Sequence, residues 1–172
     1  MKFQKTPGGT HGARTPPMPA VVSRLMRRAM IGYHRRKGDK FMGMDVLYLT
    51  TVGAKTGEHR QTPLSYFHDG DDAWLIVASA AGAARHPAWY HNMAAHPDEL
   101  TATIAGRPLR VTAAQLDGER YEHAWRQIIA AQPRYAGYQQ RTDRILPIIR
   151  LTPADTPPES STGEEAGSAA PD

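Results

Sequence analysis

The chain has 172 residues, of which 40% are hydrophobic, with 21 Lys and Arg, 17 Asp and Glu, and no cysteine. This size and composition predict one soluble domain with a buried core, and the absence of cysteine excludes disulfides and thiolate chemistry. No apolar run is long enough for a transmembrane helix, and no signal-peptide pattern follows the N-terminal lysines. We therefore expect a cytoplasmic protein.

Charge is distributed unevenly along the chain. Residues 1–40 contain ten Lys and Arg and one acid, residues 41–152 contain equal numbers of basic and acidic residues, and the tail from Pro153 contains five acids and no base. The formal net charge is +4, and the excess of positive charge lies in residues 1–40. A neutral body is not expected to bind nucleic acid.

Both ends of the chain have the composition of disordered segments. Residues 1–19 are rich in Gly and Pro and predict a disordered arm. Residues 153–172 combine Pro, Ser, Gly and acids and predict a disordered acidic tail. The domain is expected to span residues 20–152.

Apolar residues from Ala20 to about Tyr33 recur at helical spacing, with arginines on the other faces. We expect this amphipathic basic helix to cover one end of the domain. Contact of residues 20–37 with a membrane surface is the alternative, because basic amphipathic helices also bind lipid.

The middle of the chain predicts a mainly β protein. Two helices are expected, one starting near Pro87 and ending before Pro97, and one from Asp117 to Gln132. Short segments with strand composition follow one another between turn signals; they are Val46–Thr51, Gln61–Phe67, Ala73–Ala78, Leu100–Ala105, Leu109–Ala114 and Leu146–Leu151. Six such strands with few helices favour an antiparallel barrel, and no GxGxxG follows any of them, which argues against a Rossmann fold.

Residues 50–63 (TTVGAKTGEHRQTP) connect the first two predicted strands. Gly53 and Gly57 allow a tight turn and close approach of a ligand. Lys55 supplies a point charge and Arg60 a planar donor fork, which suit a phosphate or carboxylate. The spacing does not match a Walker loop, and an ordinary hairpin with a solvated charged tip is the alternative.

A second informative stretch, residues 78–92 (ASAAGAARHPAWYHN), places a loop of small residues between a strand and a helix. Unpaired N–H groups beside Arg85 would suit an anion or a carbonyl oxygen. His86, His91 and His96 are five residues apart and scatter around a helix, so no metal site is expected.

Neither a catalytic serine elbow nor a pair of catalytic carboxylates can be identified in the sequence. A domain that grips an anion and lacks its own acid–base or nucleophile set indicates that a cofactor carries the chemistry.

Three motifs in the same order resemble the deazaflavin (coenzyme F420)-dependent nitroreductase family of actinobacteria. They are TTxGxKTGxxRxTP, then ASxxGxxxHPAWYHN, then PRYAGYQQRTDR at residues 133–144. The resemblance covers roughly residues 20–152. It implies a split β-barrel of about six antiparallel strands with flanking helices, related to the flavin-binding split barrels.

The resemblance also implies roles for individual residues. Lys55 and Arg60 would hold the phosphate and acidic tail of coenzyme F420, and Ser79 and Tyr138 would donate a hydrogen bond or proton to the acceptor. The full expected cofactor site consists of Lys55, Thr56, Arg60, Thr62, Pro63, Ser79, Ala80, Ala81, Gly82, Arg85, Trp89 and Asn92. The expected substrate pocket consists of Ser65, Gln132, Tyr135 and Tyr138.

Three positions differ from the pattern of this family. Ala80 stands where relatives commonly have a lysine, so Lys55 and Arg60 would bear more of the phosphate grip. Ser65 and Gln132 stand at aromatic positions of the nitroimidazole-reducing member, so we expect another acceptor.

The predicted reaction is hydride transfer from reduced coenzyme F420 to a small acceptor: a quinone, an activated enone or a nitroaromatic. An FMN-binding oxidoreductase of the same fold and a non-catalytic cofactor- or lipid-binding protein are the alternatives. The sequence leaves open whether the protein is a monomer or a homodimer.

Overall fold

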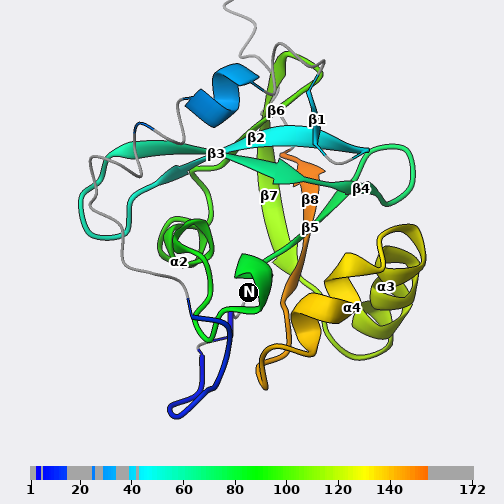
Figure 1. Ribbon diagram of the computed structural model, residues 1–172. Helices are drawn as coiled ribbons and strands as arrows, with labels where there is room; N and C mark the ends of the chain where they lie inside the picture. Colours follow the sequence, from blue (N-terminus) through cyan, green and yellow to red (C-terminus); the bar gives the residue numbers. More distant parts are fainter. Residues whose placement is uncertain are drawn as a thin grey trace, which may run out of the picture.

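A computed structural model describes residues 3–4, 6–14, 25, 29–33, 39–41 and 43–154 (Figure 1). Within the predicted N-terminal helix, residues 25 and 29–33 are helical. The rest of that helix, most of the proposed membrane-contact segment 20–37, and the acidic tail after residue 154 lie outside the described residues.

The described part of the chain forms one antiparallel sheet, and all six predicted strands are present. Two further strands of two residues each, β1 and β4, extend it. The strands are β1 (Lys40–Phe41), β2 (Met44–Val52), β3 (His59–Ser65), β4 (Phe67–His68), β5 (Trp74–Val77), β6 (Thr101–Ile104), β7 (Arg107–Gln115) and β8 (Ile148–Pro153).

The sheet curls into a half-barrel. Its strand order is β1-β2-β6-β7-β8-β5-β4, and β3 pairs with β2 along the whole length of β3, from Val46 opposite Ser65 to Val52 opposite His59. β6 pairs with β2 only from Tyr48 to Thr50, whereas β3 pairs with β2 as far as Val52, so the β2–β3 connection extends past the part of β2 that pairs with β6. The predicted split-barrel fold is confirmed.

Two hydrophobic clusters fill the two sides of the sheet. One joins β2, β6, β7 and β8 to α2 (Ala88–Ala95) through Leu47, Leu49, Trp89 and Met93. The other joins β5 and β8 to α3 (Gly118–Ala131) and α4 (Arg134–Gln139). Figure 1 shows α2 on one side of the sheet and α3 with α4 on the other, with the short 3-10 helix η1 (Ala80–Gly82) between them.

Residues 3–14, part of the arm expected to be disordered, contact the body where they are described. The N–H of Ala13 donates to the Gly82 carbonyl at 2.8 Å, and Ala13 and Ala83 form an isolated parallel bridge. Phe3 packs edge-on against Tyr90, with ring centroids 5.5 Å apart. The composition of this segment does not reveal these long-range contacts.

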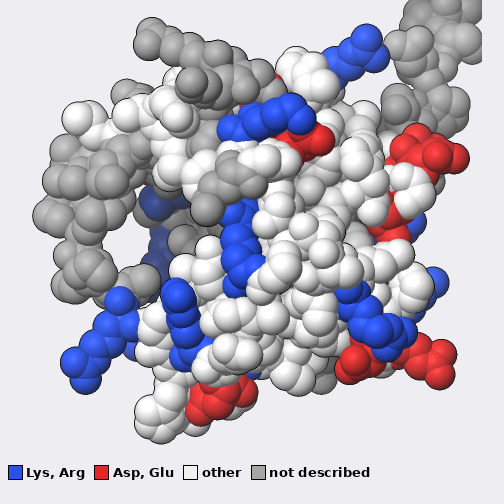
Figure 2. Space-filling view, turned by 45° about the vertical axis from the view of Figure 1, so that its right-hand side comes forward, with Lys and Arg blue, Asp and Glu red and all other residues white. Residues whose placement is uncertain are grey.

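The charges on the surface are mixed. On the face shown in Figure 2, Lys and Arg are separated by uncharged residues, and acidic side chains lie near its edges. Among the described residues, no helix combines the length and apolar character needed to cross a membrane.

Candidate functional site

A cavity of about 200 Å³ lies where β2, β3, β5, η1 and α4 meet. Six of the residues predicted for the cofactor and substrate sites line it: Pro63, Ser65, Ser79, Ala81, Tyr135 and Tyr138. The other lining residues are Met30, Phe41, Val46, Leu64, Val77 and Arg134. The sequence therefore anticipates half of the cavity wall.

The walls of this cavity are mainly apolar, with a few polar groups among them. Tyr135 and Tyr138 pack edge to face, with ring centroids 5.7 Å apart. Burial raises the pKa of Tyr135, and the neighbouring Arg134 partly opposes that shift. Flat apolar walls with a few hydroxyls suit a planar ring system carrying polar substituents.

The Ser79 loop closes one side of the cavity in an unusual backbone conformation. Ala80 and Ala81 have φ angles of 45° and 53°, and Gly82 has a φ of 82°. Left-handed alanines are costly, and such strain persists only where the surrounding structure holds it. A Cβ at Gly82 would lie 2.6 Å from the Tyr138 carbonyl oxygen, so only glycine lets the loop approach α4 this closely.

Arg144 holds the Ser79 loop in place from behind. Its side chain is 4% exposed, and its guanidinium donates to the carbonyls of Ala78 (3.1 Å), Ser79 (2.8 Å) and Ala83 (2.8 Å). A planar donor fork can satisfy several carbonyls at once, which a lysine cannot. The carbonyls of the loop are therefore turned toward Arg144.

His86 completes this arrangement as a neutral group. Its Nδ1 lies 3.1 Å from Nη1 of Arg144. Burial, together with Arg144 and His91, lowers the pKa of His86 to about 4. The neutral ring accepts from the guanidinium at physiological pH, and in this structure it supports the loop.

The loop between β2 and β3 carries the predicted anion-binding residues. Lys55 and Thr56 are exposed, while Arg60 is only partly exposed. The Nη2 of Arg60 contacts Thr56 Oγ1 at 3.2 Å and Glu58 Oε2 at 3.4 Å. Arg60 Nε is buried and has no hydrogen-bond partner among the described residues.

Asn92 fixes this loop to α2. The Ala54 N–H donates to its Oδ1 at 3.1 Å, and its Nδ2 donates to Thr51 Oγ1 at 3.1 Å. The side chain is 8% exposed. The structure thus places Asn92 as a positioning residue for the loop, with both ends of its amide engaged by protein.

β3 connects this loop to the cavity. Pro63, Leu64 and Ser65 of β3 line the cavity, and Arg60 stands near the start of the same strand. Alternate residues of a strand share a face, so Pro63 and Ser65 lie on one face of β3 and Arg60 on the other. A ligand with a ring in the cavity and an anionic tail would have to extend roughly 13 Å along four residues of β3 to reach Arg60.

Ten of the sixteen predicted residues do not line the cavity. Seven of them lie on the β2–β3 connection, on β3, in the Ser79 loop or at Asn92, and the other three lie elsewhere. Trp89 is 6% exposed and packs in the core beside Met93, and Arg85 is exposed. Gln132 lies at a separate cavity of about 610 Å³, beside Gly43, Tyr66 and α3. Its position at the C-cap of α3 turns it away from the Ser79 loop, which chain order alone does not reveal.

Sequence reasoning missed Arg134 and Arg144. Both stand inside the motif at residues 133–144, so the signal was present as two arginines flanking the predicted tyrosines. Their roles depend on contacts with Met44 and Ala78, which are far away in the sequence. Met30 and Phe41 also line the cavity and were not predicted.

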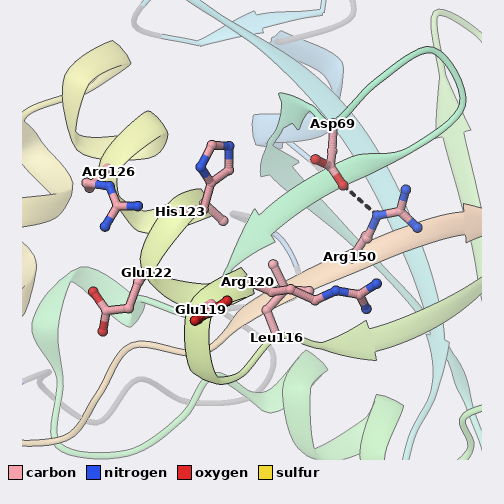
Figure 3. A pocket seen from close by; sticks show the side chains of 9 residues that line it. Asp69, Leu116, Glu119, Arg120, Glu122, His123, Arg126 and Arg150 are labelled. Atoms are coloured by element: carbon pink, nitrogen blue, oxygen red, sulfur yellow. Dashed lines mark hydrogen bonds and ion pairs between the residues drawn. The ribbon is translucent and has the colours of Figure 1, made fainter.

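A larger cavity of about 880 Å³ lies between α3, β8 and the turn at Asp69 (Figure 3). Its charged side chains include Glu119, Arg120 and Glu122, and an ion pair joins Arg150 to Asp69. In the described part of the chain, no cluster of three or more His, Asp or Glu could hold a metal ion.

Comparison with known proteins identifies the family. The model of the F420H(2)-dependent quinone reductase family matches residues 22–153. The F420H(2)-dependent quinone reductase of Mycobacterium tuberculosis strain H37Rv is 44% identical over 110 residues, covering 62% of this chain and 72% of the relative. The fold and site define a split-barrel oxidoreductase. The chain belongs to the F420H(2)-dependent quinone reductase family, which confirms the predicted relationship to F420-dependent enzymes of actinobacteria.

Solved structures agree with this assignment. An F420-H2 dependent reductase (FDR-A) is 36% identical, with a TM-score of 0.55, covering 62% of this chain and 92% of that one. A second structure, described as a domain-swapped dimer, is 30% identical, with a TM-score of 0.56, covering 77% of this chain and 99% of that one.

Proposed function

We propose that this protein transfers a hydride from reduced coenzyme F420 to a quinone-type acceptor in the cavity between β3, the Ser79 loop and α4. Membership of the F420H(2)-dependent quinone reductase family supports the cofactor and the reaction. The observation that carries the location is the cavity itself, because six residues of the predicted site converge there from three separate segments.

The described residues of the β2–β3 hairpin and the Ser79 loop fit coenzyme F420. Arg60 offers a buried Nε that lacks a partner among the described residues, which suits an anionic group of the cofactor. Lys55 is exposed on the same loop and adds a second cation. Pro63 and Ala81 supply flat apolar surface for the deazaflavin ring.

Bound coenzyme F420 supplies the hydride, and the protein supplies position and polarity. Tyr135 and Tyr138 would orient a flat acceptor and exclude water from it. The hydroxyls of Ser79 and Tyr138 both line the cavity, and either would donate a hydrogen bond to an acceptor oxygen. These roles for Ser79 and Tyr138 remain predictions.

A titration with oxidised coenzyme F420, followed by fluorescence, tests the cofactor site. We expect Lys55→Ala and Arg60→Ala each to weaken binding about tenfold, because each removes a charge-assisted contact. Arg126→Ala, on the exposed side of α3, is the matched control and should bind like the wild type. Unchanged binding by both loop variants would place the cofactor elsewhere.

The same experiment separates the alternatives. A protein that purifies with a flavin spectrum and ignores coenzyme F420 would be an FMN enzyme. A protein that binds coenzyme F420 tightly and turns over no quinone, enone or nitroaromatic would be a carrier.

We further propose a homodimer as the form to test by light scattering, because a relative 30% identical to this chain is described as a domain-swapped dimer. A cytoplasmic location and contact of residues 20–37 with a membrane surface remain predictions.

A further inference from the structure

Arg134 is the only charged residue among those that line the 200 Å³ cavity in the described part of the chain. It stands at the first position of α4, directly before Tyr135. The other polar side chains of the wall are hydroxyls, on Ser65, Ser79 and the two tyrosines. Among the described residues, Arg134 therefore brings a positive charge to a wall that is otherwise apolar or hydroxyl-bearing.

Neutral groups surround the guanidinium on several sides. Its Nη2 lies 3.0 Å from Met44 Sδ, and its central carbon lies 5.5 Å from the ring centroid of Tyr135 and 5.8 Å from that of Phe41. Aromatic faces and a thioether make favourable contacts with a guanidinium. These contacts hold the Arg134 side chain at the cavity wall.

The proposed reaction creates a charge that such a group would stabilise. A quinone that accepts a hydride gains two electrons and one proton, and the carbon–oxygen double bond opens. One oxygen becomes a phenolate anion until a second proton arrives from water. The hydride comes from the reduced cofactor, which is oxidised by the same two electrons. Fixed donors aimed at a developing oxyanion are among the strongest catalytic devices.

The geometry points to Arg134 as the residue that stabilises the oxyanion formed on the acceptor, and hence as a determinant of specificity for quinones. This inference rests on the proposed function. It extends that function by distinguishing acceptors whose reduced form carries a localised phenolate from those whose charge is spread elsewhere. Ser79 and Tyr138 would add hydrogen bonds to the same oxygen, but they would not supply charge.

A matched pair of ligands tests the inference without turnover. 2-Hydroxy-1,4-naphthoquinone is an anion at neutral pH and mimics the charged product, whereas 2-methyl-1,4-naphthoquinone is neutral and similar in size. Binding of each is measured by calorimetry to the full-length protein, as wild type, Arg134→Met and Arg134→Lys. Arg126→Met serves as a control that removes a charge outside the cavity.

We expect Arg134→Met to lose at least tenfold in affinity for the anion and less than threefold for the neutral quinone, since a charge-assisted contact is lost only with the anion. Arg134→Lys should recover part of the difference, because it keeps the charge without the donor fork. Equal losses for both ligands would show a purely structural role and overturn the inference. Wild-type affinity of Arg134→Met for both ligands would also overturn the inference.

Steady-state kinetics give an independent reading. For 2-methyl-1,4-naphthoquinone, Arg134→Met should lower kcat by about 100-fold with a small change in KM, as removal of an oxyanion donor does. Titration with coenzyme F420 should be unchanged, because Arg134 is not part of the proposed cofactor grip. Failure of the wild type to bind the cofactor would refute the proposed function, while the anion selectivity would still be measurable.

Discussion

The two loops that border the site are held in place by different kinds of contact. The β2–β3 loop at residues 53–58 is exposed at most positions and is tied to α2 by one neutral amide, that of Asn92. The Ser79 loop has two alanines at positive φ and is tied by the buried guanidinium of Arg144 through three carbonyls. The β2–β3 loop presents the positive charge of Lys55 to a ligand, and the Ser79 loop forms one wall of the cavity. A charged contact tolerates some movement, whereas a wall against a flat ring does not.

The largest expected effect comes from removing the anchor of the Ser79 loop. Arg144→Met would remove the donor to the carbonyls of Ala78 and Ala83, at about 1–3 kcal/mol for each buried group. The Ser79 carbonyl would keep only its hydrogen bond from the Gly82 N–H. We expect a loss of about 3–5 kcal/mol in the free energy of unfolding. Urea denaturation measures this loss.

The same anchor should also control ligand binding. Arg144→Lys keeps the charge but satisfies fewer carbonyls, so it should remain folded and bind coenzyme F420 at least tenfold more weakly. Wild-type affinity in a folded Arg144→Lys protein would contradict the idea that this loop shapes the site.

A pH series tests the contact between Arg144 and His86. The pKa of His86 is lowered to about 4 in the folded protein, against about 6.5 when unfolded. The unfolded state therefore binds more protons between these values, so stability is complete above pH 6.5 and falls as the pH is lowered toward 4. We expect a loss of about 2 kcal/mol between pH 7.5 and 5 from this group alone.

His86→Asn is the control for the pH series, because its amide oxygen can accept from Arg144 and does not titrate. The difference in unfolding free energy between wild type and His86→Asn should change with pH in this window. A constant difference would mean that His86 has the same pKa in the folded and the unfolded protein.

The smallest effect is expected at the other loop. Asn92→Ala removes the contacts to Ala54 and Thr51 and should cost about 1–2 kcal/mol in unfolding free energy. Binding of coenzyme F420 should weaken only a few-fold, because Lys55 in the loop and Arg60 near the start of β3 both remain. A loss of affinity larger than that of Arg144→Lys would reverse the comparison between the two loops.

Much of the fold could be predicted from local patterns. Alternating apolar residues and turn signals located the six main strands, and the amphipathic stripe of residues 117–132 located α3. The two-residue strands β1 and β4 were missed because a strand that short carries no periodicity. Pairing partners such as β7 with β8 lie about 40 residues apart and leave no local trace.

The candidate site, like the fold, was only partly predicted from local patterns. Pro63, Ser79 and Tyr138 were predicted from motifs and line the cavity. Asn92 and Trp89 belong to the same motif as Ser79, but Asn92 contacts the β2–β3 loop and Trp89 packs in the core. Gln132 is only three residues from Tyr135, yet the end of α3 carries it to a different cavity.

Local residue patterns were enough to predict where six strands lie along the chain, the family and the chemical character of the two loops, because these depend on residue types at short spacing. The tertiary structure alone decided that Arg144 supports the Ser79 loop from 65 residues away and that Arg134 faces the cavity. The reason is physical: a buried guanidinium takes its partners from whatever carbonyls packing brings within reach, and packing is settled by the whole fold.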